Sequence, residues 1–204
     1  MNALLRKRNG NDHGFTLVEL MIVVAIIGVL AALAIYGVRK YLTNAKSAEA
    51  RMAVGRLAKD AQLAFEKETV TTGVIPLTTA AAIAHKLCST AAPVPALLAQ
   101  VANVKYQSSP ADWKTADLPS GLAAGWNCLK FTMSDPQYYQ YEYVLTGDPD
   151  LPAAVGDTYT ATAHGDLDGD GTESRLSMDG AIQAAGGELV LTLAATITEF
   201  QIEE

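Results

Sequence analysis

The chain is poor in the residues that most enzymes use for catalysis. Its three histidines are His13, His85 and His164, and none stands near a cysteine or serine in a recognisable nucleophile motif. The sequence also lacks a glycine-rich phosphate-binding loop and a dinucleotide-binding fingerprint. These absences argue against the common enzyme classes, and we expect a protein that is not an enzyme.

Positive charge is also scarce. The chain has 15 Lys and Arg against 22 Asp and Glu, a formal net charge of -7, which argues against nucleic-acid binding through a basic surface. From Tyr36 to Lys67 there are seven cations against three anions, whereas from Lys105 onward there are four against sixteen. Basic residues near lipid headgroups and a soluble acidic remainder explain this distribution. Electrostatic matching between packed copies is the alternative.

Polar residues are almost absent from one segment. Phe15 to Ile35 spans 21 residues, of which only Thr16 and Glu19 are polar, and a helix of this length crosses a bilayer core of roughly 30 Å. An ionised carboxylate in hydrocarbon is usually retained only where it has a partner. Cleavage between Gly14 and Phe15 would release an α-amino group that could pair with Glu19 of the same or a neighbouring chain.

Two simpler interpretations of this segment fit less well. A secretory signal peptide would explain the basic residues Arg6, Lys7 and Arg8, but its apolar region would be shorter and uncharged. A plain membrane anchor explains the length but leaves Glu19 without a role.

The segment Gly14-Phe15-Thr16-Leu17-Val18-Glu19, with the apolar run that follows it, resembles the N-terminus of the type IV pilins, of the type IVa kind with a short leader. The resemblance implies that a prepilin peptidase removes the leader, residues 1–14, and methylates the new N-terminal Phe15. It also implies that Glu19 is the carboxylate used in assembly. One departure is Tyr36, which stands where these pilins commonly carry a proline.

The periodicity of the chain predicts an α+β fold, with a long N-terminal helix packed on an antiparallel sheet. Residues 15–36 form its apolar half and residues 37–68 its amphipathic half, in which Ala50, Val54, Leu57 and Ala61 share one face. Residues 69–136 form an αβ connecting region that includes an alanine-rich helix over 77–87. Residues 137–204 form the sheet, with strands near 138–145, 158–163, 174–178, 188–191 and 196–200.

Some aromatic residues after the long helix have two interpretations. Trp113 and Trp126 pack in the core or are exposed recognition aromatics, and packing is the commoner arrangement. The tyrosines of 138–143 form an adhesive or electron-conducting stripe or, more simply, alternate along a strand and pair across it.

The two cysteines, Cys88 and Cys128, are predicted to form one disulfide. An even number of cysteines in an exported chain favours a bond, and this one would close a loop around the αβ region. Pilins of this kind often have their disulfide near the C-terminus instead, so that part of the resemblance fails.

An acidic segment, 165–173, offers a second chemical hypothesis. Asp166, Asp168, Asp170 and Glu173 could bind Ca²⁺, because alternate carboxylates followed by glycine resemble the start of an EF-hand loop. Ser177 stands at the position where that motif has a bidentate glutamate. The alternative is an acidic turn between strands, without any cofactor.

The resulting hypothesis is a structural subunit of a type IV pilus. It would wait in the bacterial inner membrane and polymerise through its N-terminal helix into a retractable surface filament for twitching motility and adhesion. Its partners would be further copies of itself, the prepilin peptidase, and the assembly machinery with its ATPases. The alternatives are a minor pilin, a type II secretion pseudopilin, or a membrane-anchored binding protein that does not polymerise.

Overall fold

The structure, a computed structural model, describes residues 14–67, 69–70, 83–118 and 123–202. The alanine-rich segment 77–82 and the leader residues 1–13 lie outside these ranges. The elements in chain order are α1 (Leu17–Phe65), β1 (Thr69–Val70), β2 (Ile83–Ala84), β3 (Ala91–Val94), η1 (Leu98–Gln100), α2 (Gly125–Leu129), β4 (Gln140–Thr146), β5 (Thr158–Gly165), β6 (Ser174–Ala185), β7 (Glu188–Leu193) and β8 (Thr198–Phe200).

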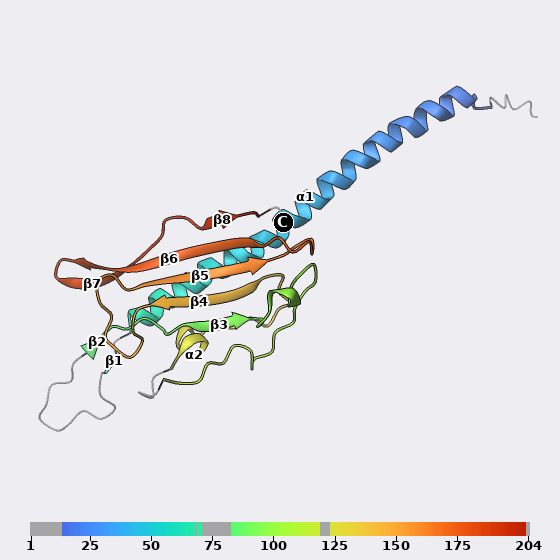
Figure 1. The fold of residues 1–204 in the computed structure, drawn as a ribbon. Coiled ribbons are helices and arrows are strands. Elements are labelled where there is room, and N and C mark those ends of the chain that lie inside the picture. The colour runs from blue at the N-terminus through green and yellow to red at the C-terminus, as the bar shows by residue number, and fades with distance from the viewer. Residues whose placement is uncertain (1–13, 68, 71–82, 119–122, 203–204) are drawn as a thin grey trace, which may run out of the picture. The chain divides into compact units, whose positions relative to one another are not determined.

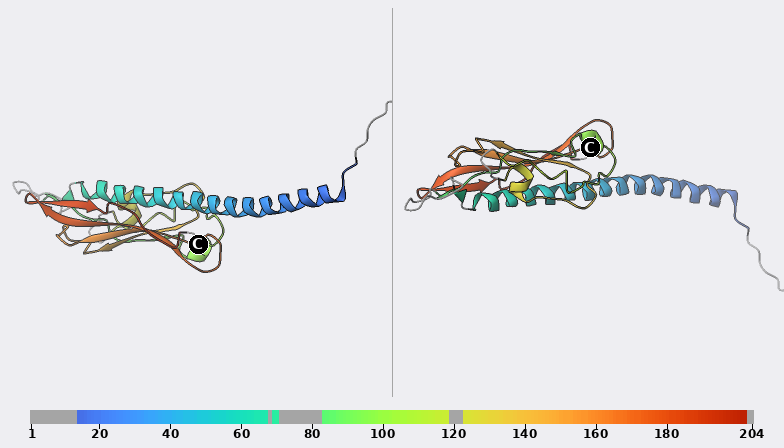
Figure 2. Two further views of the ribbon diagram at one scale, coloured as in Figure 1. Left: turned by 90° about the horizontal axis from the view of Figure 1, so that it is seen from above. Right: turned by 90° about the horizontal axis from the view of Figure 1, so that it is seen from below.

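The chain divides into two compact units, residues 1–41 and residues 42–204. The second unit, called the head here, has two layers, with the C-terminal part of α1 lying along one face of the sheet (Figures 1 and 2). Its strands follow the order β3-β4-β5-β6-β7, and all neighbours are antiparallel. β8 pairs with residues 175–177 of β6, a stretch that β7 does not reach. The predicted α+β fold is therefore confirmed.

The helix packs through the stripe that its periodicity predicts. Ala50, Val54, Leu57 and Ala61 are at most 1% exposed, because positions three and four residues apart lie on one face of a helix. The opposing sheet contributes aromatic side chains. Tyr143 stacks on Tyr159 with ring centroids 4.9 Å apart, so the aromatic alternation of β4 serves packing across the strands.

Both tryptophans are buried in the head at 1% exposure. The Trp113 indole donates to Ser108 Oγ at 3.0 Å, and the Trp126 indole donates to the Ala92 carbonyl at 2.9 Å. The two rings meet edge to face, with centroids 5.0 Å apart. Packing, rather than exposed recognition, is thus their role.

The connecting region differs from the prediction in two places. The expected helix over 77–87 is wrong for its described part, since Ile83–Ala84 is strand β2, paired with β1. The sheet also gains β3 from within this region. Its Pro93 weakens the strand signal in the sequence, but proline is tolerated in an edge strand, where one side has no partner.

Glu49 of α1 provides a test of pH dependence. Its carboxylate accepts hydrogen bonds from the Tyr138 amide at 3.0 Å and the Tyr141 hydroxyl at 3.3 Å, yet burial outweighs these bonds and raises the pKa of Glu49. A carboxyl with a raised pKa in the fold contributes most when protonated, and this contribution is lost as the pH rises through the folded pKa. We expect Glu49→Gln to raise Tm near neutral pH, with the difference vanishing below about pH 4.

Thermal unfolding of the full chain in detergent, followed by circular dichroism across this pH range, measures the effect. Glu188→Gln is the matched control, because Glu188 is exposed at the start of β7. A difference between Glu49→Gln and the parent chain that stays constant with pH would contradict the prediction.

Candidate functional site in the N-terminal segment

The N-terminal half of α1 is apolar and uncovered. Its mean hydropathy reaches 2.9, none of that stretch is buried, and it is long and apolar enough to cross a membrane. The large apolar side chains from Phe15 to Ile35 are between 47% and 87% exposed. In water such a surface would carry a large hydrophobic cost, so lipid or other protein must cover it.

The predicted cleavage position lies just before this helix. Gly14 and Phe15 precede the first helical residue, Leu17, and both are exposed. Apart from its chain neighbours, no atom of the described residues lies within 4 Å of the position that a Cβ on Gly14 would take. A non-helical, open peptide bond is accessible to a peptidase. Cleavage after Gly14 and methylation of Phe15 remain predictions.

Glu19 and Thr16 cap the start of α1 reciprocally. The amide and hydroxyl of Thr16 donate to Glu19 Oε2 at 2.9 and 2.8 Å, and the Glu19 amide donates to Thr16 Oγ1 at 3.2 Å. This is the capping-box arrangement, in which two backbone N–H groups without helical partners are satisfied by side chains. Glu19 thus has a structural role within its own chain.

Sequence reasoning missed this role of Thr16. The signal was present, because a threonine followed three residues later by glutamate, ahead of an apolar run, is the pattern of a capping box. All the hydrogen bonds that Glu19 accepts from described residues go to Oε2. Among the described residues Oε1 has no partner, so the carboxylate can cap its helix and still accept from another group.

Within the first compact unit, residues 17–41 are helical throughout. No break occurs at Gly28 or Gly37, and a Cβ at either position would meet no atom within 4 Å. Small residues on an exposed apolar helix allow another helix to approach closely.

The acidic segment brings three of its four predicted ligands together. Oxygens of Asp166, Asp168 and Asp170 lie within 4.8 Å of one another. Asp166 is buried, and it accepts from the amides of Gly169 at 2.7 Å and Gly171 at 3.2 Å. These bonds stabilise the turn that follows β5.

Glu173 is not part of this group. Its carboxylate contacts His164 Nδ1, while His164 Nε2 lies 3.1 Å from Glu142 Oε1. His164 of β5 therefore lies between the carboxylate of Glu142, in β4, and that of Glu173, just before β6. Sequence spacing could not show this, because Glu142 is brought to β5 by strand pairing.

Calcium binding by the three aspartates stays a prediction. A bound ion would offset the repulsion between their charges, so we expect millimolar Ca²⁺ to raise Tm relative to a chelator, and Mg²⁺ to do so less. Replacing Asp168 and Asp170 by asparagine should remove the effect. A Tm that is indifferent to Ca²⁺ would leave an acidic turn as the complete description.

The structure contains the predicted disulfide. Cys88 and Cys128 are bonded, with Cα atoms 5.7 Å apart and a sequence separation of 40. The bond joins α2 to the segment that precedes β3, and the enclosed loop carries Trp113 and Trp126. It therefore closes the αβ region rather than a C-terminal loop.

Comparisons with known proteins match the same N-terminal segment. Residues 9–35 match the family model described as the prokaryotic N-terminal methylation motif. The type IV major alpha-pilin of Moraxella bovis is 47% identical over 60 residues, 28% of this chain and 37% of the relative. The type IV major pilin protein PilA of Myxococcus xanthus is 56% identical over 43 residues, 21% of this chain and 20% of the relative. A probable minor fimbrial protein of Dichelobacter nodosus is 41% identical over 61 residues, 30% of this chain and 38% of the relative.

The chain thus matches less than two fifths of the length of each of these relatives. No solved structure matches it significantly. The described residues form an α+β fold with an exposed apolar helical segment near the N-terminus. The matched N-terminal segment carries the methylation motif and is similar to segments of type IV pilins and fimbrial proteins.

Proposed function

We propose that this chain is the structural subunit of a type IV pilus and polymerises through its N-terminal helix. The observation that carries the proposal is the fully exposed apolar half of α1, which contains a single carboxylate with one oxygen still available. Lipid covers this surface before assembly, and the helices of other copies cover it afterwards. The motif and relatives named above support the same role.

Glu19 selects the register in which helices pack. After cleavage, the amine of Phe15 is a cation that can donate to Glu19 Oε1 of a neighbouring copy, while Oε2 continues to cap the helix. A copy packed in another register leaves a charge unpaired in a dry core, which is strongly unfavourable. Apolar contact drives association, and the charge pair chooses one arrangement.

The remaining parts of the proposal concern partners and location. A prepilin peptidase processes the chain while α1 spans the inner membrane, and the pilus machinery with its ATPases moves it into a surface filament. Retraction of such a filament would produce twitching motility, and the filament would also serve adhesion.

Protein sheared from cell surfaces tests the proposal. Its intact mass and N-terminal sequence should show loss of residues 1–14, a methylated Phe15 and an intact disulfide, and electron microscopy should show fibres in the same fraction. Processed protein confined to the membrane would instead favour a minor pilin or a pseudopilin, and the minor fimbrial relative is the observation that favours this second candidate. A retained leader with no sheared protein would favour an anchored binding protein.

A further inference from the structure

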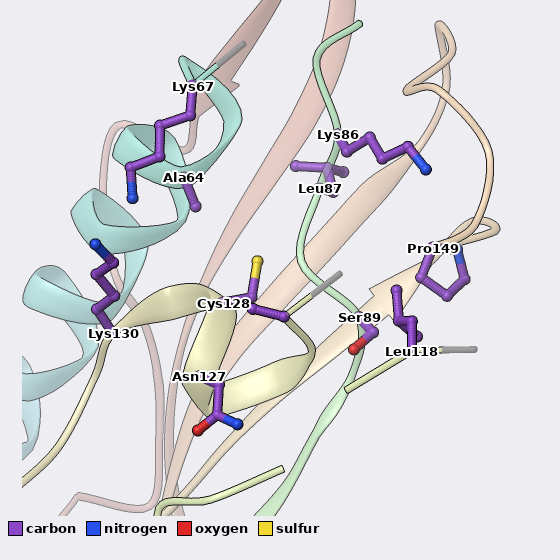
Figure 3. A pocket seen from close by; sticks show the side chains of 11 residues that line it. Ala64, Lys67, Lys86, Leu87, Ser89, Leu118, Asn127, Cys128, Lys130 and Pro149 are labelled. Carbon is purple, nitrogen blue, oxygen red and sulfur yellow. The ribbon is translucent and has the colours of Figure 1, made fainter. Parts of the chain in front are cut away.

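A cavity of about 310 Å³ lies in the head between the C-terminal end of α1, helix α2 and the segment before β3 (Figure 3). Among the described residues, Lys67, Lys86 and Lys130 line it and no aspartate or glutamate does. A cavity lined by charges of only this sign is unexpected in a chain whose net charge is -7. Its volume is at the lower end of the range for small-molecule sites, which begins at about 300 Å³.

Two of these lysines form a pair. In Figure 3 the side chains of Lys67, beyond the end of α1, and Lys130, beyond α2, point toward one another. Among the described residues neither ammonium group has a hydrogen bond or an ion pair, and like charges facing one another repel. Lys86 differs, because it points away and donates to the Asp150 carbonyl at 2.6 Å. An anion placed between Lys67 and Lys130 would relieve their repulsion.

The cavity also offers neutral polar groups. Ser89 is only 8% exposed and its Oγ accepts from the Gly125 amide at 2.9 Å, but its own hydroxyl hydrogen has no acceptor within the described part of the chain. A buried donor without an acceptor is costly. The amide nitrogen of Asn127 donates to the Thr115 carbonyl at 2.6 Å, which leaves the side-chain oxygen of Asn127 able to accept.

Apolar side chains complete the lining. Leu87, Leu118 and the disulfide-bonded Cys128 lie beside these polar groups. The cavity therefore combines a pair of cations, one hydroxyl donor, one amide acceptor and small apolar surfaces. A simple inorganic anion would use only the cations.

We propose that this cavity binds an acidic sugar, that is, a hydroxylated ring carrying a carboxylate or a phosphate. The acidic group lies between Lys67 and Lys130, because lysine binds such groups as a point charge. Ring hydroxyls accept from Ser89 and donate to Asn127, and the C–H faces of the ring contact Leu87 and Leu118. This binding role is independent of filament assembly, since it uses none of the residues of the N-terminal segment.

Isothermal titration calorimetry of the full chain in nonionic detergent at low salt tests the proposal. The probes are glucuronate and glucose 6-phosphate, with glucose and inorganic phosphate as comparisons. We expect both acidic sugars to bind, glucose to give no measurable heat, and inorganic phosphate to bind about tenfold more weakly than the sugar phosphate. The ratio between the two acidic sugars tells whether a carboxylate or a phosphate is the better acidic group.

Lys67→Gln and Lys130→Gln should each weaken binding by about tenfold. Tm should not fall, because both side chains are exposed and each change removes a repulsion. Lys114→Gln is the matched control, since it removes the same charge from an exposed position outside the cavity. Three results would overturn the proposal. Lys67→Gln and Lys130→Gln could bind the acidic sugars as tightly as the parent chain does, Lys114→Gln could lose as much affinity as they do, or the parent chain could bind neither acidic sugar. None of these results would count against the proposed assembly into fibres, which is tested separately by the sheared fraction.

Discussion

Cells that produce Glu19→Ala should retain the processed protein in the membrane but form few or no fibres. The substitution removes both the carboxylate oxygen that caps α1 and the one available to an amine of another copy. Loss of a cap costs only about 1 kcal/mol, which a membrane-spanning helix tolerates. Loss of the charge leaves the amine of every packed neighbour unpaired in an apolar core, with a penalty of about 3–5 kcal/mol per subunit.

Two further variants separate the cap from the charge. Glu19→Gln keeps an oxygen acceptor that can complete the capping box but has no charge, whereas Thr16→Ala loses the cap and keeps the carboxylate. If charge pairing decides assembly, Glu19→Gln should resemble Glu19→Ala, and Thr16→Ala should still form fibres. Electron microscopy and immunoblots of sheared and membrane fractions measure both. Abundant normal fibres from Glu19→Gln would refute the pairing mechanism.

Removal of the disulfide should lower the free energy of unfolding of the head by about 4 kcal/mol. The bond closes a loop with a sequence separation of 40 residues, and the chain-entropy estimate for such a loop lies between the values of about 3 and 4.7 kcal/mol for shorter and longer ones. Cys88→Ala combined with Cys128→Ala is the appropriate variant, because Cys88 is 2% exposed and a serine would bury a hydroxyl there. Chemical denaturation of the full chain in detergent gives the value.

The parent chain treated with a reductant is the matched control for this variant. It loses the same cross-link but keeps both sulfur atoms, so the two should unfold at similar denaturant concentrations. A loss well below 1 kcal/mol in both would show that packing around Trp113 and Trp126 holds the αβ region without the bond.

Local patterns in the sequence predicted much of the head. The stripe of Ala50, Val54 and Leu57 indicated which face of α1 is buried, and all three residues are at most 1% exposed. The five predicted strands correspond to β4 through β8, because alternation with turn residues between runs is a local signal. β6 extends to Ala185, beyond its predicted end, because β7 pairs with that extension.

Predictions were weakest where a residue depends on a distant partner. Glu173 was expected beside the aspartates, but strand pairing places Glu142 near His164, which then contacts Glu173. The alanines and proline of β3 carry no strong strand signal. They form a strand because β4 offers an edge to pair with.

The sequence by itself determined the features that arise from neighbours along the chain: the apolar segment with Glu19, the capping pattern with Thr16, and the amphipathic stripe of α1. Helical contacts span only three or four residues, so composition and spacing are enough to specify them. Only the tertiary structure decided the features that join distant segments. These are β3 in the sheet, the carboxylates around His164, and the cavity where Lys67 faces Lys130, because the packing of the whole head sets which distant residues meet.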